Sequence, residues 1–291
     1  MTEQIEELRK QYLAGKISRR EFIQRAVLLT GSLAAGAGIL GSLFPQRAGA
    51  AQVDPGDPTL TSSDVKYAAS DGTSVNAYLT RPRGNEKHPA IVVIHDNGAL
   101  DDHNRDVARR LAKAGYVTIV PDLLSRQGGT DSFPNRDAVA QAISKADNEG
   151  VMTDLAGAVN YLKAQNFVLP NKVGVVGFCW GGGKTLLFTM RSKDLAASVI
   201  YYGPIPNDLD GVANITAPVL AHYGELDKPI TSQVPRLEEA MKKYSKSYEY
   251  KIYADAPHAF NGDNRPDRYR PEAAKEAWNR TLSFFKKNLQ G

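Results

Sequence analysis

Gly177-Phe178-Cys179-Trp180-Gly181 is the stretch that decides the fold, and it lies between an apolar run at residues 172–177 and a helical pattern that begins near Gly182. Its form is glycine, any residue, nucleophile, any residue, glycine. A sharp turn from a strand into a helix strains the backbone of the middle residue, so the positions two residues to either side must lack bulk. The stretch therefore predicts a thiol at the amino end of a helix, where the helix dipole favours the thiolate. The alternative is an inert buried cysteine beside glycines that allow close helix packing.

Apolar strands alternate with helical periods along most of the chain. The predicted strands are residues 90–94, 116–120, 172–177, 197–201, 218–222 and 248–253, and the predicted helices are residues 102–115, 151–164, 234–243, 271–288 and the one that begins near Gly182. Asp71 and Gly72 predict a hairpin turn between residues 66–69 and 75–81. Continuous apolar strands that alternate with helices indicate an α/β fold, with a mostly parallel sheet that is covered by helices on both faces.

A thiol nucleophile needs an imidazole beside it, and the imidazole needs an acceptor that fixes its tautomer. Asp227 follows the predicted strand at residues 218–222, and His258 follows the one at residues 248–253. Both therefore lie past the carboxyl ends of parallel strands, where an open sheet collects its ligands. Glu225 is the rival acid.

These motifs together resemble the dienelactone hydrolase family over residues 65–289. The carriers of the resemblance are Gly177-Phe178-Cys179-Trp180-Gly181-Gly182-Gly183, Pro121-Asp122-Leu123, Gly224-Glu225-Leu226-Asp227 and Pro257-His258-Ala259-Phe260. The resemblance implies an α/β-hydrolase fold and a catalytic triad of Cys179, His258 and Asp227. It also implies an oxyanion hole made by the backbone amides of Asn97 and Trp180, a structural role for Asp122, no cofactor, and cleavage of a carboxylic ester or lactone in the manner of a carboxymethylenebutenolidase.

The sequence departs from the family pattern at two positions near the expected site. Asp96 stands where the family typically has a glutamate that contacts the resting nucleophile. We expect Asp96 and His95 to lie next to the catalytic residues and to act through them. Gly262 stands where members that cleave dienelactones have an arginine for the substrate carboxylate. Arg126 or Arg136 could supply an anion pocket in its place. These departures leave a second hypothesis, a periplasmic binding protein that keeps the hydrolase fold without turnover.

The first fifty residues carry the features of an export signal. Ser18-Arg19-Arg20-Glu21-Phe22-Ile23 resembles the twin-arginine signature, an uncharged stretch covers residues 26–44, and Ala48-Gly49-Ala50 has the small residues of a cleavage site. We expect residues 1–50 to be an export signal, residues 51–63 a linker and residues 64–291 the catalytic domain. The twin-arginine machinery would then carry the folded chain to the periplasm or beyond, without a stable membrane anchor. An amphipathic helix with a chance arginine pair is the alternative.

The charge distribution and the spacing of the histidines bear on two kinds of partner, nucleic acid and metal ions. Seven of the 36 basic residues and four of the 32 acidic residues lie in the first fifty positions, so the remaining chain is nearly neutral. A clustered basic face for nucleic acid is therefore not expected. We expect His222 in the core and His88 and His103 at the surface, and their spacing does not predict a metal site.

Overall fold

The computed structural model describes residues 4, 7–8, 11, 17, 19–30 and 51–291. An eight-stranded sheet forms its centre, in the order β1-β2-β4-β3-β5-β6-β7-β8. The strands are β1 (Leu60–Ala68), β2 (Ser74–Pro82), β3 (His88–Ile94), β4 (Val117–Pro121), β5 (Val168–Phe178), β6 (Ala197–Tyr201), β7 (Val219–Gly224) and β8 (Tyr248–Tyr253). Strands β4, β3, β5, β6, β7 and β8 are neighbours in this order and run parallel to one another. At one edge, β2 pairs antiparallel with β4, and β1 pairs antiparallel with β2. The predicted fold class, a mostly parallel α/β sheet, is confirmed.

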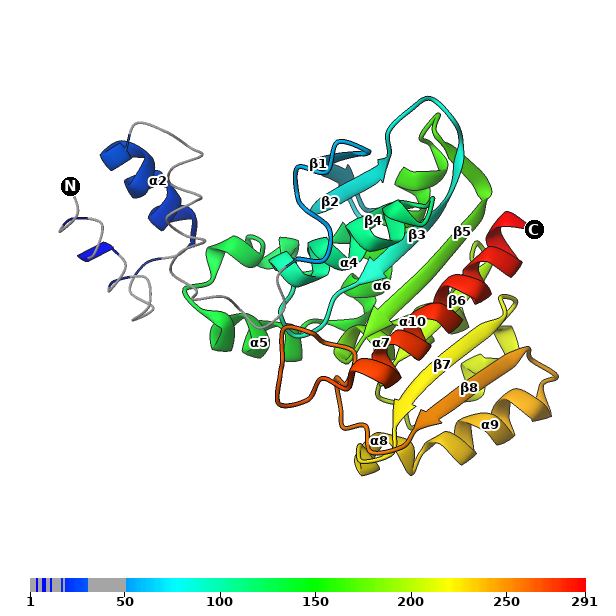
Figure 1. Cartoon of the computed structure of the whole chain (residues 1–291). Helices are drawn as coiled ribbons and strands as arrows, with labels where there is room; N and C mark the ends of the chain where they lie inside the picture. The colour runs from blue at the N-terminus through cyan, green and yellow to red at the C-terminus, as the bar shows by residue number, and fades with distance from the viewer. Residues whose placement is uncertain (1–3, 5–6, 9–10, 12–16, 18, 31–50) are drawn as a thin grey trace.

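Helices cover both faces of this sheet (Figure 1). One face packs against α4 (Asp102–Lys113) and α10 (Pro271–Phe285), and the other against α6 (Asn148–Lys163), α7 (Trp180–Arg191) and α9 (Val234–Lys243). Alternate side chains of a strand point to opposite faces, so Ile91 and Val93 join the first layer while Val92 and Ile94 join the second. Burial on both sides explains why β3 reads as one continuous apolar run.

The amino-terminal part of the catalytic unit differs from the expectation. Strand β1 begins at Leu60, inside the segment 51–63 that we expected to be a linker. The backbone of Val53 is also held against α4, since its N–H donates to Asp106 and its carbonyl oxygen accepts from Arg109, each at 2.9 Å. This segment therefore packs on the domain and does not lead into it as a free linker. The predicted hairpin between β1 and β2 is present, with Gly72 at a φ of 84° in its turn.

The twin-arginine pair opens a helix, α2 (Arg19–Thr30). The expected cleavage site at Ala48 to Ala50 lies outside the described residues. Within the part of the chain that the structure describes, no helix combines the length and apolar character needed to cross a membrane.

Candidate active site

Cys179 occupies a strained turn between β5 and α7. Its φ of 56° and ψ of −120° place it in a region that residues with side chains rarely adopt. Its N–H donates to the carbonyl oxygen of Tyr201 on β6 at 3.0 Å, which ties the turn to the neighbouring strand. A Cβ at Gly181 would lie 2.3 Å from the carbonyl oxygen of His95, and one at Gly177 would lie 2.3 Å from that of Gly181. The predicted turn is confirmed, and the two glycines are needed because backbone occupies the space beside them.

The turn brings the Cys179 thiol next to an imidazole and a carboxylate. His258, in the loop after β8, has its Nε2 3.0 Å from Cys179 Sγ and its Nδ1 2.6 Å from Asp227 Oδ2. Asp227 follows β7 and is 8% exposed, so its carboxylate is largely shielded from solvent. The rival acid Glu225 instead accepts the N–H of Asp255 at 3.1 Å. The structure thus brings together the three side chains that the sequence singled out, in the order thiol, imidazole, carboxylate.

Electrostatics favour a protonated His258. Burial would lower its pKa, but the hydrogen bonds to Asp227 and Cys179 and their negative charges outweigh burial and raise the pKa to about 9. An imidazolium at neutral pH donates from both ring nitrogens, toward the carboxylate on one side and the sulfur on the other. The arrangement can therefore hold a thiolate and an imidazolium as a pair.

Two loops at the same sheet edge carry the amides expected to bind an oxyanion. Strands β3 and β5 are paired so that Ile94 lies opposite Gly177, and Asn97 and Trp180 are each three residues further along. Trp180 is the first residue of α7, so its N–H has no acceptor within the helix. Asn97 is exposed, in an otherwise largely buried loop that is folded back by a 2.8 Å hydrogen bond from the Gly98 N–H to Asp96 Oδ1. The strand register therefore puts both residues at the sheet edge that carries Cys179, and their role as oxyanion donors stays a prediction.

His95 and Asp96 support the loop that carries Asn97. His95 is fully buried, stacks on the Trp180 ring at 5.7 Å, and accepts the N–H of Leu123 at 3.3 Å through Nε2. Burial lowers its pKa and keeps the ring neutral. Asp96 stands where the family resemblance implies a glutamate; its Oδ2 accepts from Arg265 Nη2 at 2.8 Å, and within the described part of the chain no hydrogen bond joins it to Cys179. Burial would raise the pKa of Asp96, but the charge of Arg265, the hydrogen bonds from Gly98 and Asn104 and the charge of His103 together outweigh burial and lower the pKa.

Arg265 and Tyr202 are site residues that the sequence reasoning missed. The Tyr202 ring meets the His258 ring edge-on at 5.1 Å and is buried. Tyr202 directly follows β6, so its place at the carboxyl end of a strand was a usable signal. Arg265 offered no local signal, because its partner Asp96 lies 169 residues away along the chain.

Of the two arginines considered for an anion pocket, Arg126 is already paired with carboxylates. Arg126 builds no anion pocket, because it pairs with Asp71 and the fully buried Asp154, each at 2.8 Å. Arg136 is exposed at the start of α5 (Arg136–Ser144).

The remaining histidines differ from one another. His103 is 14% exposed and pairs with Asp263, and His88 is half-buried at the start of β3, so both are less exposed than expected. His222 lies in the core as expected, hydrogen-bonded to Tyr253 and Thr281.

Asp122 has the structural role expected of it, since its carboxylate accepts from the backbone and hydroxyl of Thr130. Among the described residues, no three His, Cys, Asp or Glu side chains are grouped so that they could hold a metal ion.

The sequence matches one protein family over most of its length. The profile of the dienelactone hydrolase family aligns with residues 75–289. A relative from Methylorubrum extorquens, named "Putative carboxymethylenebutenolidase", is 34% identical, and the alignment covers 78% of this chain and 81% of the relative. A relative from Bradyrhizobium sp., named "Probable 2-oxo-3-(5-oxofuran-2-ylidene)propanoate lactonase", is 36% identical over 76% of this chain and 92% of its own.

Solved structures agree with the sequence matches. The crystal structure of a "Putative Dienelactone Hydrolase" from Klebsiella pneumoniae superimposes with a TM-score of 0.72 at 29% identity, and covers 78% of this chain and 99% of the other. The described sheet and its flanking helices are therefore those of a known α/β-hydrolase architecture.

Proposed function

The chain belongs to the dienelactone hydrolase family and is a hydrolase, and from this premise we propose that it cleaves a carboxylic ester or lactone with Cys179 as nucleophile. The observation that carries the proposal is the contact chain at the elbow, with Cys179 Sγ 3.0 Å from His258 Nε2 and His258 Nδ1 2.6 Å from Asp227. Sulfur, imidazole and carboxylate in this order are the parts of a nucleophilic triad. The hypothesis of a binding protein without turnover is set aside because the family is one of hydrolases.

Acylation begins with the thiol proton on His258 Nε2. The thiolate attacks the carbonyl carbon of the substrate and forms a carbon–sulfur bond, and the carbonyl electron pair moves onto oxygen. The N–H groups of Asn97 and Trp180 bind this oxyanion. When the carbonyl re-forms, the carbon–oxygen bond to the leaving group breaks, and His258 returns the proton to the departing alkoxide. A thioester on Cys179 remains, and with a lactone the leaving alcohol stays attached to the acyl group.

Deacylation uses the same groups with water in place of the thiol. His258 takes a proton from water as the oxygen attacks the thioester carbonyl, and the same two amides bind the second oxyanion. Collapse of this intermediate breaks the carbon–sulfur bond and releases the carboxylic acid. The Cys179 thiolate and the His258 imidazolium are restored, with Asp227 holding the imidazole tautomer throughout.

The names of the two relatives favour lactones and activated esters as substrates. Both names describe enzymes that open an unsaturated lactone ring, and a thiolate suits such activated acyl groups. The arginine that would hold a substrate carboxylate in dienelactone-cleaving members is replaced by Gly262. We therefore place the preference among small lactones and aryl esters, without requiring a carboxylate on the substrate.

Substitution of Cys179 tests this proposal. Cys179→Ala should abolish hydrolysis of phenyl acetate and of small unsaturated lactones while the circular dichroism spectrum stays that of the wild type. Cys179→Ser should retain a small fraction of the activity, because a hydroxyl can attack but is far less acidic. Wild-type turnover by the alanine variant would rule out the mechanism.

We also propose that residues 1–50 direct export by the twin-arginine machinery and are removed. The supporting features are the Arg19-Arg20 pair and the small residues Ala48 and Ala50. Protein recovered from the periplasm should begin at Ala51, and the Arg19→Lys, Arg20→Lys double variant should stay inside the cell. Periplasmic protein that begins at Met1, or normal export of the double variant, would contradict export by this route.

A further inference from the structure

Asp263 lies in the loop that joins His258 to α10, and the proposed chemistry gives it no role. Consecutive turns run through this loop, with the Gly262 N–H donating to the Ala259 carbonyl and the Arg265 N–H donating to the Gly262 carbonyl, both at 3.0 Å. Ala259 itself has a φ of 64°. His258 and Asp263 therefore belong to one short, tightly turned segment, and a displacement of one is passed to the other.

Three side chains from two distant segments bind the Asp263 carboxylate. Its Oδ2 accepts from Gln52 Nε2 and from Arg110 Nη2, each at 2.7 Å, and its Oδ1 lies 3.3 Å from His103 Nδ1. The side chain is only 10% exposed. Burial would raise the pKa of Asp263, but the hydrogen bond from His103 and the charge of Arg110 outweigh it and hold the pKa far below its usual range. A carboxylate bound in this way is a firm anchor point.

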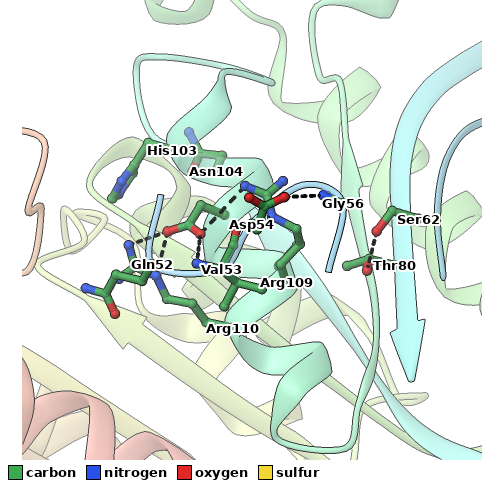
Figure 2. A network of polar contacts seen from close by, with 12 residues as sticks. Gln52, Val53, Asp54, Gly56, Ser62, Thr80, His103, Asn104, Arg109 and Arg110 are labelled. Carbon is green, nitrogen blue, oxygen red and sulfur yellow. Dashed lines mark hydrogen bonds and ion pairs between the residues drawn. The ribbon is translucent and has the colours of Figure 1, made fainter. Parts of the chain in front are cut away.

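The partners of Asp263 are themselves fixed on α4. Arg110 Nε also donates to Asp106 at 2.7 Å, and Asp106 accepts the Val53 N–H at 2.9 Å. Arg109 Nε donates to the Val53 carbonyl oxygen at 2.9 Å. Figure 2 shows Gln52, Val53, Arg109 and Arg110 gathered in this network. The family match covers residues 75–289, so Gln52 and Val53 lie outside the matched region.

We propose that Asp263 is a positioning residue that holds His258 in line with Cys179, and that Gln52 and Val53 complete its anchor on α4. The proposal rests on the proposed function, in which His258 is the proton carrier. The contact at stake is the 3.0 Å approach of His258 Nε2 to Cys179 Sγ. A misplacement of about 1 Å at reacting groups costs about 100-fold in rate, so a loop that moves by a fraction of this distance is felt in kcat. The same loop is also held by the ion pair between Arg265 and Asp96, so loss of the Asp263 contacts should make the loop more mobile without detaching it.

Asp263→Asn in the full chain is the direct test, because it keeps the shape of the side chain and removes its charge. The matched control is Asp57→Asn, which removes a carboxylate that binds Lys113 of α4 at 3.0 Å and has no described contact with the His258 loop. For each variant, kcat and KM for phenyl acetate are measured, together with the rate of Cys179 alkylation by iodoacetamide across about pH 5 to 10. Alkylation needs no substrate and reports the thiolate–imidazolium pair itself.

Asp263→Asn should lower kcat by about 10-fold with KM changed by less than about twofold, and should slow alkylation at neutral pH. Asp57→Asn should match the wild type in all three readouts, and Asp263→Glu, which restores the charge, should recover part of the loss. Gln52→Met should shift kcat and alkylation in the same direction by about threefold, and it decides the matter if Asp263→Asn does not fold.

The proposal is overturned if a folded Asp263→Asn keeps the wild-type kcat and alkylation rate. If Asp263→Asn fails to fold, the same result in Gln52→Met overturns it. Equal losses in Asp57→Asn would also overturn it, because they would show a general effect of stability. Cys179→Ala run in parallel separates the two claims: if it retains turnover, the proposed function fails, while the alkylation profiles still decide whether Asp263 positions His258.

Discussion

The exchange of Asp227 for asparagine tests the electrostatics of the triad. Asp227 accepts the His258 Nδ1–H at 2.6 Å while only 8% exposed. The pKa of His258 is raised from 6.5 to about 9, so the folded protein favours the imidazolium by about 3 kcal/mol, at about 1.4 kcal/mol for each pKa unit. Asp227 and Cys179 both contribute to this preference. If Asp227 supplies half of this preference, its loss lowers the pKa of His258 by a little over one unit, and the ratio of the thiolate–imidazolium pair to the neutral thiol and imidazole falls by about 20-fold.

We therefore expect Asp227→Asn to reduce kcat/KM for phenyl acetate at neutral pH by at least about 20-fold, and the rate of Cys179 alkylation by a similar factor. An amide can also hold the wrong imidazole tautomer, an effect that costs about 10⁴-fold in kcat in a serine protease triad. The matched control is Glu225→Gln, at the rival acid, which should keep wild-type rates. The electrostatic reasoning is refuted if Asp227→Asn stays within about twofold of the wild type, or if Glu225→Gln is the more damaging change.

Three further outcomes follow from contacts in the site and around it. Gly181→Ala should destabilise the protein by about 3 kcal/mol or more in urea unfolding, because its Cβ would lie 2.3 Å from the His95 carbonyl oxygen; a wild-type midpoint would contradict this packing. The pKa of His258 is raised to about 9, so its proton is present below that pH and lost above it. We therefore expect kcat for an alkyl ester to fall above about pH 9, while kcat for p-nitrophenyl acetate, whose leaving group needs no proton, should not fall. Parallel declines for the two esters would argue against His258 as the acid. Arg126→Met should cost about 3 to 5 kcal/mol of stability, since it leaves the buried Asp154 unpaired, and should not change KM for carboxylate-bearing esters; a selective rise of that KM would restore the anion pocket that the structure argues against.

The sequence was sufficient for the sheet and for the meeting of Cys179, His258 and Asp227. Strands such as β3 are buried on both faces, so they appear as unbroken apolar runs, and the glycines around Cys179 mark a turn that tolerates no other residue. His258 and Asp227 follow predicted strands of a parallel sheet, so their meeting at one edge could be inferred before any coordinates. In each case the sequence signal is local, a strand or a turn, although His258 and Cys179 lie 79 residues apart.

The missed features depend on contacts between distant segments. Asp96 meets Arg265 across 169 residues, and Asp263 meets Gln52 across 211. Neither pair has a local pattern, because charged side chains in polar loops are common whether or not they are paired. The proline and aspartate content of the segment before β1 predicts a linker, and no local pattern indicates the backbone hydrogen bonds of Val53 to Asp106 and Arg109.

The nature of the covalent intermediate tests the central claim most directly. The enzyme is mixed with p-nitrophenyl acetate, quenched in acid within the first turnover, digested, and analysed by mass spectrometry. We predict one acetyl group on the peptide that contains Cys179, formed at the rate of the p-nitrophenolate burst and absent in Cys179→Ala. Acetylation of a different residue, or steady hydrolysis with no acyl group on Cys179 at any time, would contradict the account.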